Sequence, residues 1–373
     1  MRLRQRQVRA DFLWVDPWGW AYVLMRTLTA LGTLLTLSFN GPSILFHPRV
    51  DAEQPPVCVE PLGTVSMLCQ GSPEIWRYVG IAVLVVVLSG WRPRLLALPH
   101  VWVTWSASFS ISLPEGGDQV ASNLALLLLP LALADGRRWV WQVDPDRRAR
   151  LLADPVLDFR TLLGLSVVVL VRLQACVIYL DAAVSKFRVT EWQDGTAIYY
   201  WFRDPLFVPG DIRDDIAFAL TSTPVGTALI TWGGLATELA LAAAIFAGRR
   251  SRRVLLVLGL AFHGMIAIVF GLVTFWIAMA ALLVMYLGFD DDFGGLRRRV
   301  AGIGSLLTGL VRRARPGDGR PVSAPPAWSP TTEPRDRPAR DLVGVGADGD
   351  RGAKREARDA ADEATTPIGA NST

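Results

Sequence analysis

One lysine stands apart in this chain. Of its 38 Lys and Arg residues only Lys186 and Lys354 are Lys, and Lys186 alone falls in the first 353 residues. Arg keeps its proton at any useful pH, whereas desolvation can make a Lys amine a base or a nucleophile. Lys186 therefore indicates proton chemistry. The alternative is a structural Lys whose stem lies in lipid and whose ammonium reaches the membrane surface.

Lys186 belongs to a polar stripe on an apolar segment. Arg172, Tyr179 and Lys186 recur at intervals of seven, which places them near one face of a helix. Such a stripe should face protein or a water-filled cavity rather than lipid.

Three more polar residues fall near the middle of other apolar segments: Arg26, Glu238 and His263. A charge inside a bilayer is costly, so we expect Glu238 to pair with either Arg26 or Arg172. An ion-pair network that only holds helices together is the alternative to a role in chemistry.

Asp118 starts another predicted helix, in the run Gly116-Gly117-Asp118-Gln119. Asp often caps a helix N-terminus; a polar lip on the same side as Lys186 is the other interpretation, and the residues favour neither. His100 and His263 have no Cys or carboxylate three or four residues on, so we expect no metal site. The chain has no phosphate-binding loop and no dinucleotide fingerprint.

Apolar segments predict the elements that position these residues. The chain is 51% hydrophobic with a mean hydropathy of +0.32, and a membrane span needs about 20 apolar residues. The predicted spans are Trp18–Phe39, Ile75–Trp91, Leu95–Leu113, Gln119–Asp135, Thr161–Phe187, Pro224–Ala247, Val254–Phe270 and Val273–Phe289. The last two are predicted to turn at Gly271 and Leu272.

These segments predict an all-α, polytopic membrane helical bundle of about eight helices over residues 18–289. Residues 1–17 form a cytoplasmic N-terminal segment. Residues 290–373 are rich in Arg, Pro, Asp, Gly and Ala without apolar periodicity, which predicts a disordered cytoplasmic tail. The net charge of +4 mostly reflects Arg residues predicted to be cytoplasmic, so it does not indicate a nucleic-acid partner. The apolar spans predict a lipid bilayer as partner.

Clustered Arg predicts the orientation. Clusters precede the first span, follow the eighth, and separate the second from the third, the fourth from the fifth and the sixth from the seventh. Loops rich in Arg stay cytoplasmic. Eight spans therefore place every cluster and both termini on the cytoplasmic side of the cell membrane, with Lys186 at the external face; seven spans would break this agreement.

Cysteine placement agrees with this orientation. Cys58 and Cys69 both lie in the first external connection, where an oxidising compartment permits a disulfide bond. Two separate thiols are the alternative. Cys176 is alone inside a predicted span and is expected to serve packing.

The segment from Tyr179 to Tyr200 resembles the lysine box of the HTTM superfamily, which includes the vitamin K-dependent gamma-carboxylases. Lys186 falls on the position of the carboxylase lysine that is held to deprotonate vitamin K hydroquinone, and Trp192 and Gly195 match the Trp and Gly that follow. The resemblance implies a general base at Lys186 and a quinone-like lipid as cofactor or substrate. The other polar residues of the spans would support that base.

Further segments resemble the sporulation-delaying protein B family, a branch of this superfamily. They include Gly90-Trp91-Arg92-Pro93, Gly116-Gly117-Asp118-Gln119, Arg137-Arg138-Trp139, and His263 through Gly271 to Phe275. In that family the membrane protein, with a small partner protein, matures a secreted peptide toxin. A membrane enzyme acting on such a precursor, a non-enzymatic scaffold for it and, third, a transporter are the functions the sequence leaves open.

The orientation can be tested with reporter fusions. Fusions after Gly116 and after Gly248 should report opposite sides of the membrane, with Gly116 external, because Arg clusters lie only on the side of Gly248. Both reporters on one side would contradict the eight-span topology.

Overall fold

The computed structural model describes residues 16–46, 58, 61–112, 115–144, 146–147, 149–150, 158–204 and 212–288. The expected tail, 290–373, and nearly all of the expected N-terminal segment lie outside these residues. All described residues belong to the unit Met1–Ala314.

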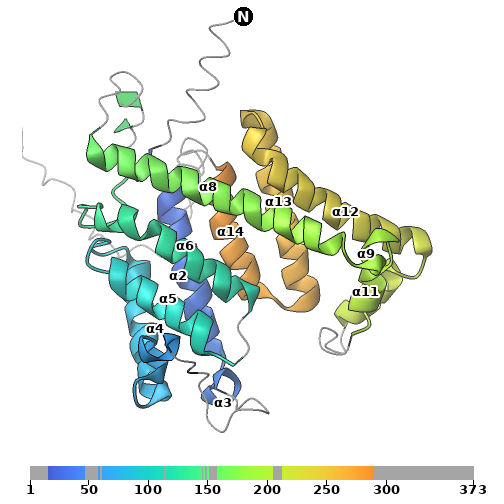
Figure 1. The fold of residues 1–373 in the computed structure, drawn as a ribbon, viewed down its shortest axis with the longest axis horizontal. Coiled ribbons are helices and arrows are strands. Elements are labelled where there is room, and N and C mark those ends of the chain that lie inside the picture. The colour runs from blue at the N-terminus through green and yellow to red at the C-terminus, as the bar shows by residue number, and fades with distance from the viewer. Residues whose placement is uncertain are drawn as a thin grey trace, which may run out of the picture. The chain divides into compact units, whose positions relative to one another are not determined.

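Every predicted span contains a helix (Figure 1). The main helices are α2 (Trp20–Phe39), α4 (Pro73–Ser89), α5 (Ala97–Ser110), α6 (Gly116–Leu133), α8 (Phe159–Lys186), α12 (Pro224–Ala243), α13 (Arg249–Phe270) and α14 (Val273–Leu287). Short helices complete the described part: α3 (Pro42–Leu45), α9 (Thr190–Gln193), α10 (Ala197–Trp201), α11 (Ile212–Leu220), and the 3-10 turns Leu62–Thr64, Met67–Cys69 and Ala244–Phe246. The described residues contain no strand, only an isolated bridge between Trp91 and Trp139.

Five helices of the described chain are long and apolar enough to cross a membrane: α2, α6, α8, α12 with its 3-10 extension, and α13. The prediction of an all-α membrane bundle is confirmed, whereas length supports five spans and not eight. At 1.5 Å per residue the 14 residues of α5 reach only about 21 Å. The roles of α4, α5 and α14 as spans stay predictions.

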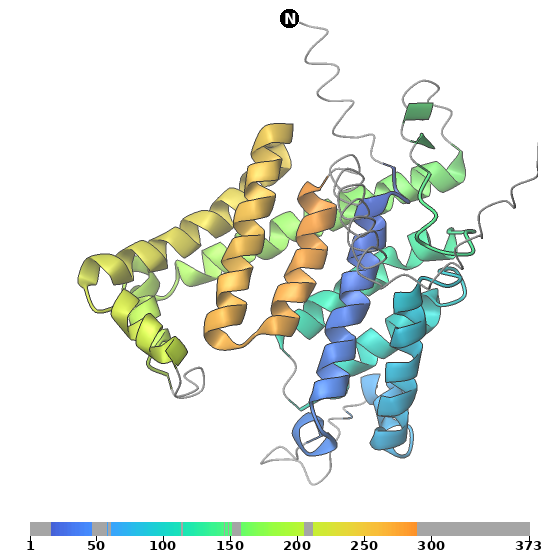
Figure 2. The ribbon, with the colours of Figure 1, turned by 180° about the vertical axis from the view of Figure 1, so that it is seen from behind.

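Helix α14 is the packing centre of the described bundle. Every residue from Ile277 to Leu287 is buried. Figures 1 and 2 show α14 between α2 and α13, with α8 crossing these helices. One apolar core joins α2, α6, α8, α12 and α14, and a second joins α2 to α4 and α5.

The predicted break between the last two helices is confirmed. Helix α13 ends at Phe270 and is followed by Gly271, whose φ of +75° is a left-handed conformation that glycine adopts without strain. Leu272 follows, and α14 starts at Val273, so the two helices form a hairpin.

The disulfide bond is also confirmed. Cys58 and Cys69 are joined, with their Cα atoms 5.9 Å apart. Met67 and Leu68, next to this bond, are buried in the core formed with α4 and α5. Cys176 is free and partly buried in α8.

Candidate functional site

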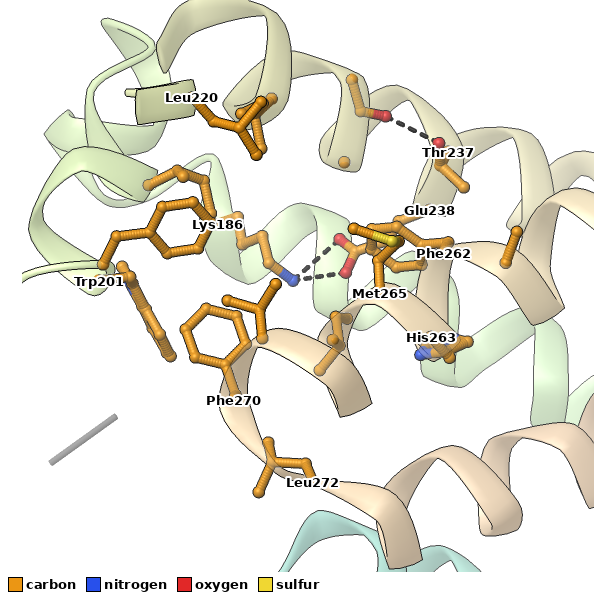
Figure 3. Close-up of a pocket in the computed structure, with 18 of the residues that line it drawn as sticks. Lys186, Trp201, Leu220, Thr237, Glu238, Phe262, His263, Met265, Phe270 and Leu272 are labelled. Atoms are coloured by element: carbon orange, nitrogen blue, oxygen red, sulfur yellow. Dashed lines mark hydrogen bonds and ion pairs between the residues drawn. The ribbon is translucent and has the colours of Figure 1, made fainter. Parts of the chain in front are cut away.

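Lys186 is the last residue of α8 and forms an ion pair with α12. Its Nζ donates to Oε1 of Glu238 at 2.7 Å and to Oε2 at 2.9 Å (Figure 3). The Lys side chain is 26% exposed and that of Glu238 9%. The expectation that Glu238 pairs with Arg26 or Arg172 is corrected: the partner that the structure gives it is Lys186. Residue spacing within one helix could not predict this pair, because Lys186 and Glu238 lie on different helices and are 52 residues apart in sequence.

Helical periodicity brings the carboxylate inward. The buried residues of α12 include Thr227, Thr231, Leu235, Glu238 and Leu241, spaced by three or four. Glu238 thus lies on the stripe of α12 that faces protein, where a carboxylate needs a partner.

The turn after α8 holds the ammonium from the other side. The ring of Trp192 in α9 lies 5.3 Å from Nζ of Lys186, within range of a cation–π interaction. Gly195 has a φ of +83°, and a Cβ there would approach Trp232 of α12 to 3.0 Å. The Lys, Trp and Gly of the lysine box are therefore placed around one point, where the end of α8 meets α12.

A second polar pair lies beside the first. The hydroxyl of Tyr179, on α8, is 3.0 Å from Nε2 of His263, on α13, and both side chains are buried. His263 occurs in the inward stripe of α13 with Arg252, Gly259 and Ala267. The other ring nitrogen, Nδ1, has no hydrogen-bond partner among the described residues.

Of these groups, Lys186, Trp192, Glu238 and His263 line a cavity of about 620 Å³. Most of its lining residues come from α12 and α13, and the end of α8 and the short helices α9 to α11 contribute others. Its lining comprises Lys186, Trp192, Ile198, Trp201, Phe202, Leu220, Ile230, Gly233, Gly234, Thr237, Glu238, Leu258, Ala261, Phe262, His263, Met265, Ile266, Val269, Phe270, Leu272 and Phe275. Figure 3 shows the Lys186–Glu238 pair within this otherwise mostly apolar wall.

The remaining predicted site residues lie elsewhere in the bundle and do not line this cavity. Arg26 of α2 is buried and donates from Nη1 to the carbonyl oxygen of Val87 at 2.9 Å. Arg172 is buried on α8.

Asp118 belongs to a capping box at the start of α6, whose N-cap residue is Glu115. Its Oδ1 accepts from the hydroxyl of Thr36 at 3.0 Å and its Oδ2 from the backbone N–H of Glu115 at 3.3 Å. The bond from Thr36 connects α6 to α2, and the bond from Glu115 lies within the capping box. Glu115 in turn accepts a hydrogen bond from Thr274 of α14 at 2.5 Å, so this end of α6 is held by two neighbouring helices.

Two features of the cavity were not predicted from the sequence. They are its aromatic wall, formed by Trp201, Phe202 and Phe270, and a glycine pair, Gly233 and Gly234. Phe270 lies 5.6 Å from Phe202 and 6.3 Å from Trp201 between ring centroids. Gly233 and Gly234 interrupt an apolar helix, where each glycine costs about 1 kcal/mol relative to Ala. That cost was the available signal: paired glycines inside a helix indicate a close approach or an open space.

No group of three or more His, Cys, Asp or Glu residues that could hold a metal ion occurs among the described residues. The cavity presents an amine, a carboxylate and an imidazole in an apolar wall, and a phenol, that of Tyr179, is hydrogen-bonded to the imidazole. Such a set can bind an apolar molecule and exchange a proton with its polar end.

Comparison with known proteins places this cavity in a named domain. Residues 154–290 match the HTTM domain, and this range contains every residue that lines the cavity. The sporulation-delaying protein SdpB of Bacillus subtilis (strain 168) is 34% identical over 277 residues, 73% of this chain and 82% of that protein. The uncharacterized protein YitO of the same organism is 32% identical over 277 residues, 73% of this chain and 86% of that protein. No solved structure matches the chain.

The ion pair can be tested through stability. Replacing Lys186 with Met leaves the carboxylate of Glu238 nearly buried and unpaired. We expect a loss of about 2 kcal/mol, less than for a fully buried pair because Lys186 is partly exposed. The double variant Lys186→Met/Glu238→Met should recover most of this stability, since two apolar side chains need no partner. The thermal midpoints of the purified proteins in detergent give the measurement; a double variant no more stable than the single one would contradict the pairing.

Proposed function

Because the chain belongs to the sporulation-delaying protein B family of HTTM proteins, we propose that it matures or modifies a secreted, toxin-like peptide precursor, with Lys186 as general base. It is a multi-pass membrane protein of the HTTM type. We further propose that it resides in the cell membrane with both termini cytoplasmic and Lys186 at the external face. The resemblance to its family also suggests a small partner protein.

The contact between Lys186 and Glu238 is the observation that carries this proposal. Transfer of one proton from Nζ to Oε1, across 2.7 Å, leaves an amine and a carboxylic acid. Both products are neutral, and an apolar wall disfavours charged groups. The free amine can then accept a proton from the polar end of a substrate held in the cavity, which is the act of a general base.

Other residues would support this step without carrying it. The ring of Trp192 covers the ammonium, and the hydrogen bond with Tyr179 orients His263, which lines the cavity. We assign these three residues positioning roles. Arg172, Arg26 and Asp118 do not line the cavity, and we assign them to helix packing.

The cavity indicates the chemical class of the substrate. A mostly apolar space of about 620 Å³ with polar groups on one side fits an amphipathic molecule whose polar end meets Lys186. The quinone-like lipid that the carboxylase resemblance suggests has this character, and so does an apolar segment of a peptide.

The general base is tested by Lys186→Arg. The variant keeps the positive charge and a long stem, so it should insert and fold, but it cannot release a proton. We expect the product to fall by about 100-fold or more. The product is defined as the secreted peptide species that disappears from the host when the gene is deleted, and it is quantified by mass spectrometry at matched membrane levels of protein.

Two outcomes of this experiment separate the candidate functions. Loss of product in the Arg variant, with an unchanged thermal midpoint, supports the base. Wild-type output would reject the base and leave a non-enzymatic scaffold, because a scaffold needs the charge and shape of the site rather than its proton.

The cavity is tested at Gly234, one helical turn before Glu238. A Cβ at this position would meet Phe262 at 3.6 Å, an ordinary contact. Gly234→Ala should therefore keep the cavity, whereas Gly234→Phe must place its ring in it. We expect product to fall about 15-fold for the Phe variant, the cost of displacing about two methylene groups of substrate, and to stay unchanged for the Ala variant. Equal output from both variants would show that the cavity is not used.

A further inference from the structure

The segments that follow the C-terminal ends of α4 and α6 are distant in sequence but are joined by hydrogen bonds. Trp91, after α4, pairs with Trp139, after α6, in an isolated antiparallel bridge. The backbone N–H of Arg92 donates to the carbonyl of Arg138, and that of Val140 donates to the carbonyl of Gly90, each at 2.8 Å. This junction is not part of the cavity that contains Lys186.

The backbone of the junction is held in a strained form. Arg92 has a φ of +38°, and it is the one non-glycine residue with positive φ among those that the structure describes. Gly90 has a φ of +80°, and a Cβ there would lie 2.3 Å from Nε1 of Trp141. That indole N–H donates to the carbonyl of Ser89 at 2.8 Å. Strained backbone persists only where its surroundings determine it, and it is common at binding sites.

The result is a surface that combines indoles with guanidinium groups. Trp91, Trp139 and Trp141 remain 37–38% exposed. The side chains of Arg92, Arg94 and Arg138 are exposed beside them, and within the described ranges no carboxylate forms an ion pair with any of the three. Two acidic residues close in sequence to Arg138 have other partners: Asp135 pairs with Arg137, and Asp144 pairs with Arg150.

Exposed apolar side chains continue from this surface along the helices. Leu95 is 59% exposed and Leu98 60%, on the chain just after Arg94, and Leu133 at the end of α6 is also exposed. A ligand that covers the whole surface therefore needs an anionic head and an apolar chain.

We propose that this Trp–Arg surface binds the phosphate headgroup of an anionic phospholipid, whose acyl chains lie against Leu95 and Leu98. Guanidinium groups bind phosphate oxygens in a bidentate manner, and indoles favour the depth of lipid headgroups. Leu95 and Leu98 begin a predicted membrane span, so an anion that contacts both the guanidinium groups and these leucines must itself carry an apolar chain, which an acidic soluble protein lacks. The lipid thus joins the ends of α4 and α6 to the start of α5. This inference does not depend on the proposed function.

The test compares two variants that each lose two positive charges. Arg94→Gln/Arg138→Gln changes the surface, and Arg188→Gln/Arg250→Gln changes two exposed Arg residues outside it. Thermal midpoints of the full chain are measured in a non-ionic detergent while dioctanoyl phosphatidylglycerol or dioctanoyl phosphatidylcholine is added. We expect phosphatidylglycerol to raise the wild-type midpoint more than phosphatidylcholine does. The half-saturating concentration should be about fivefold higher for the first variant, the effect of losing two partly exposed charge contacts, and unchanged for the second.

Three outcomes would overturn the proposal. An equal increase of the half-saturating concentration in both variants would mean that only net charge matters. An equal rise of the thermal midpoint with both lipids would mean that the site does not distinguish the headgroups. If inorganic phosphate stabilises the wild type as well as phosphatidylglycerol does, the site binds free phosphate instead of lipid. An unchanged output of the secreted peptide from the first variant would show that this site acts independently of the proposed function.

Discussion

A charge that leaves water needs a partner, and the ion pair between Lys186 and Glu238 shows how this chain meets that requirement. It joins the end of α8 to the middle of α12 and fixes one side of the cavity. Buried ion pairs stabilise a fold little more than apolar side chains of the same size would. Stability alone therefore does not explain why this chain places a Lys and a Glu in an apolar wall. The pair lines a cavity, and this position is the observation from which we propose that it exchanges a proton.

The cavity depends on elements that carry no charge. Gly271 turns the chain so that α13 returns against α14, and α14 is buried along most of its length. This places the inward stripe of α13, with His263, opposite α8. Gly233 and Gly234 keep α12 free of side chains where the cavity begins. Packing thus sets the space, and the polar groups set its chemistry.

The two halves of the described chain divide their roles. The HTTM match spans α8 to α14 and contains the candidate site. Helices α2 to α6 carry the disulfide bond, the capping box of Asp118 and the Trp–Arg surface. The halves meet where α14 packs on α2 and α6 and where Thr274 bonds Glu115. A lipid bound at the C-terminal ends of α4 and α6 would therefore act on the frame of the site and not on the Lys186–Glu238 pair itself.

The sequence by itself determined the features that depend on neighbours along the chain. Apolar length and periodicity predicted where the helices lie, Gly271 predicted the last turn, and the rarity of Lys singled out Lys186. The placement of both cysteines in one connection, predicted to be external, predicted the Cys58–Cys69 bond. Helical intervals placed Tyr179 and Lys186 on one face, since the side-chain period within a helix is a local property.

Only the tertiary structure decided which groups meet across helices. The partner of Glu238 is Lys186, although depth within the predicted spans offered Arg26 and Arg172. Position along one helix holds no information about its rotation against another. The same reason explains the pairing of Tyr179 with His263, the aromatic wall formed by Trp201 and Phe270, and the bridge of Trp91 to Trp139. Each joins residues far apart in sequence, so only the packing angles of the helices bring them within contact distance.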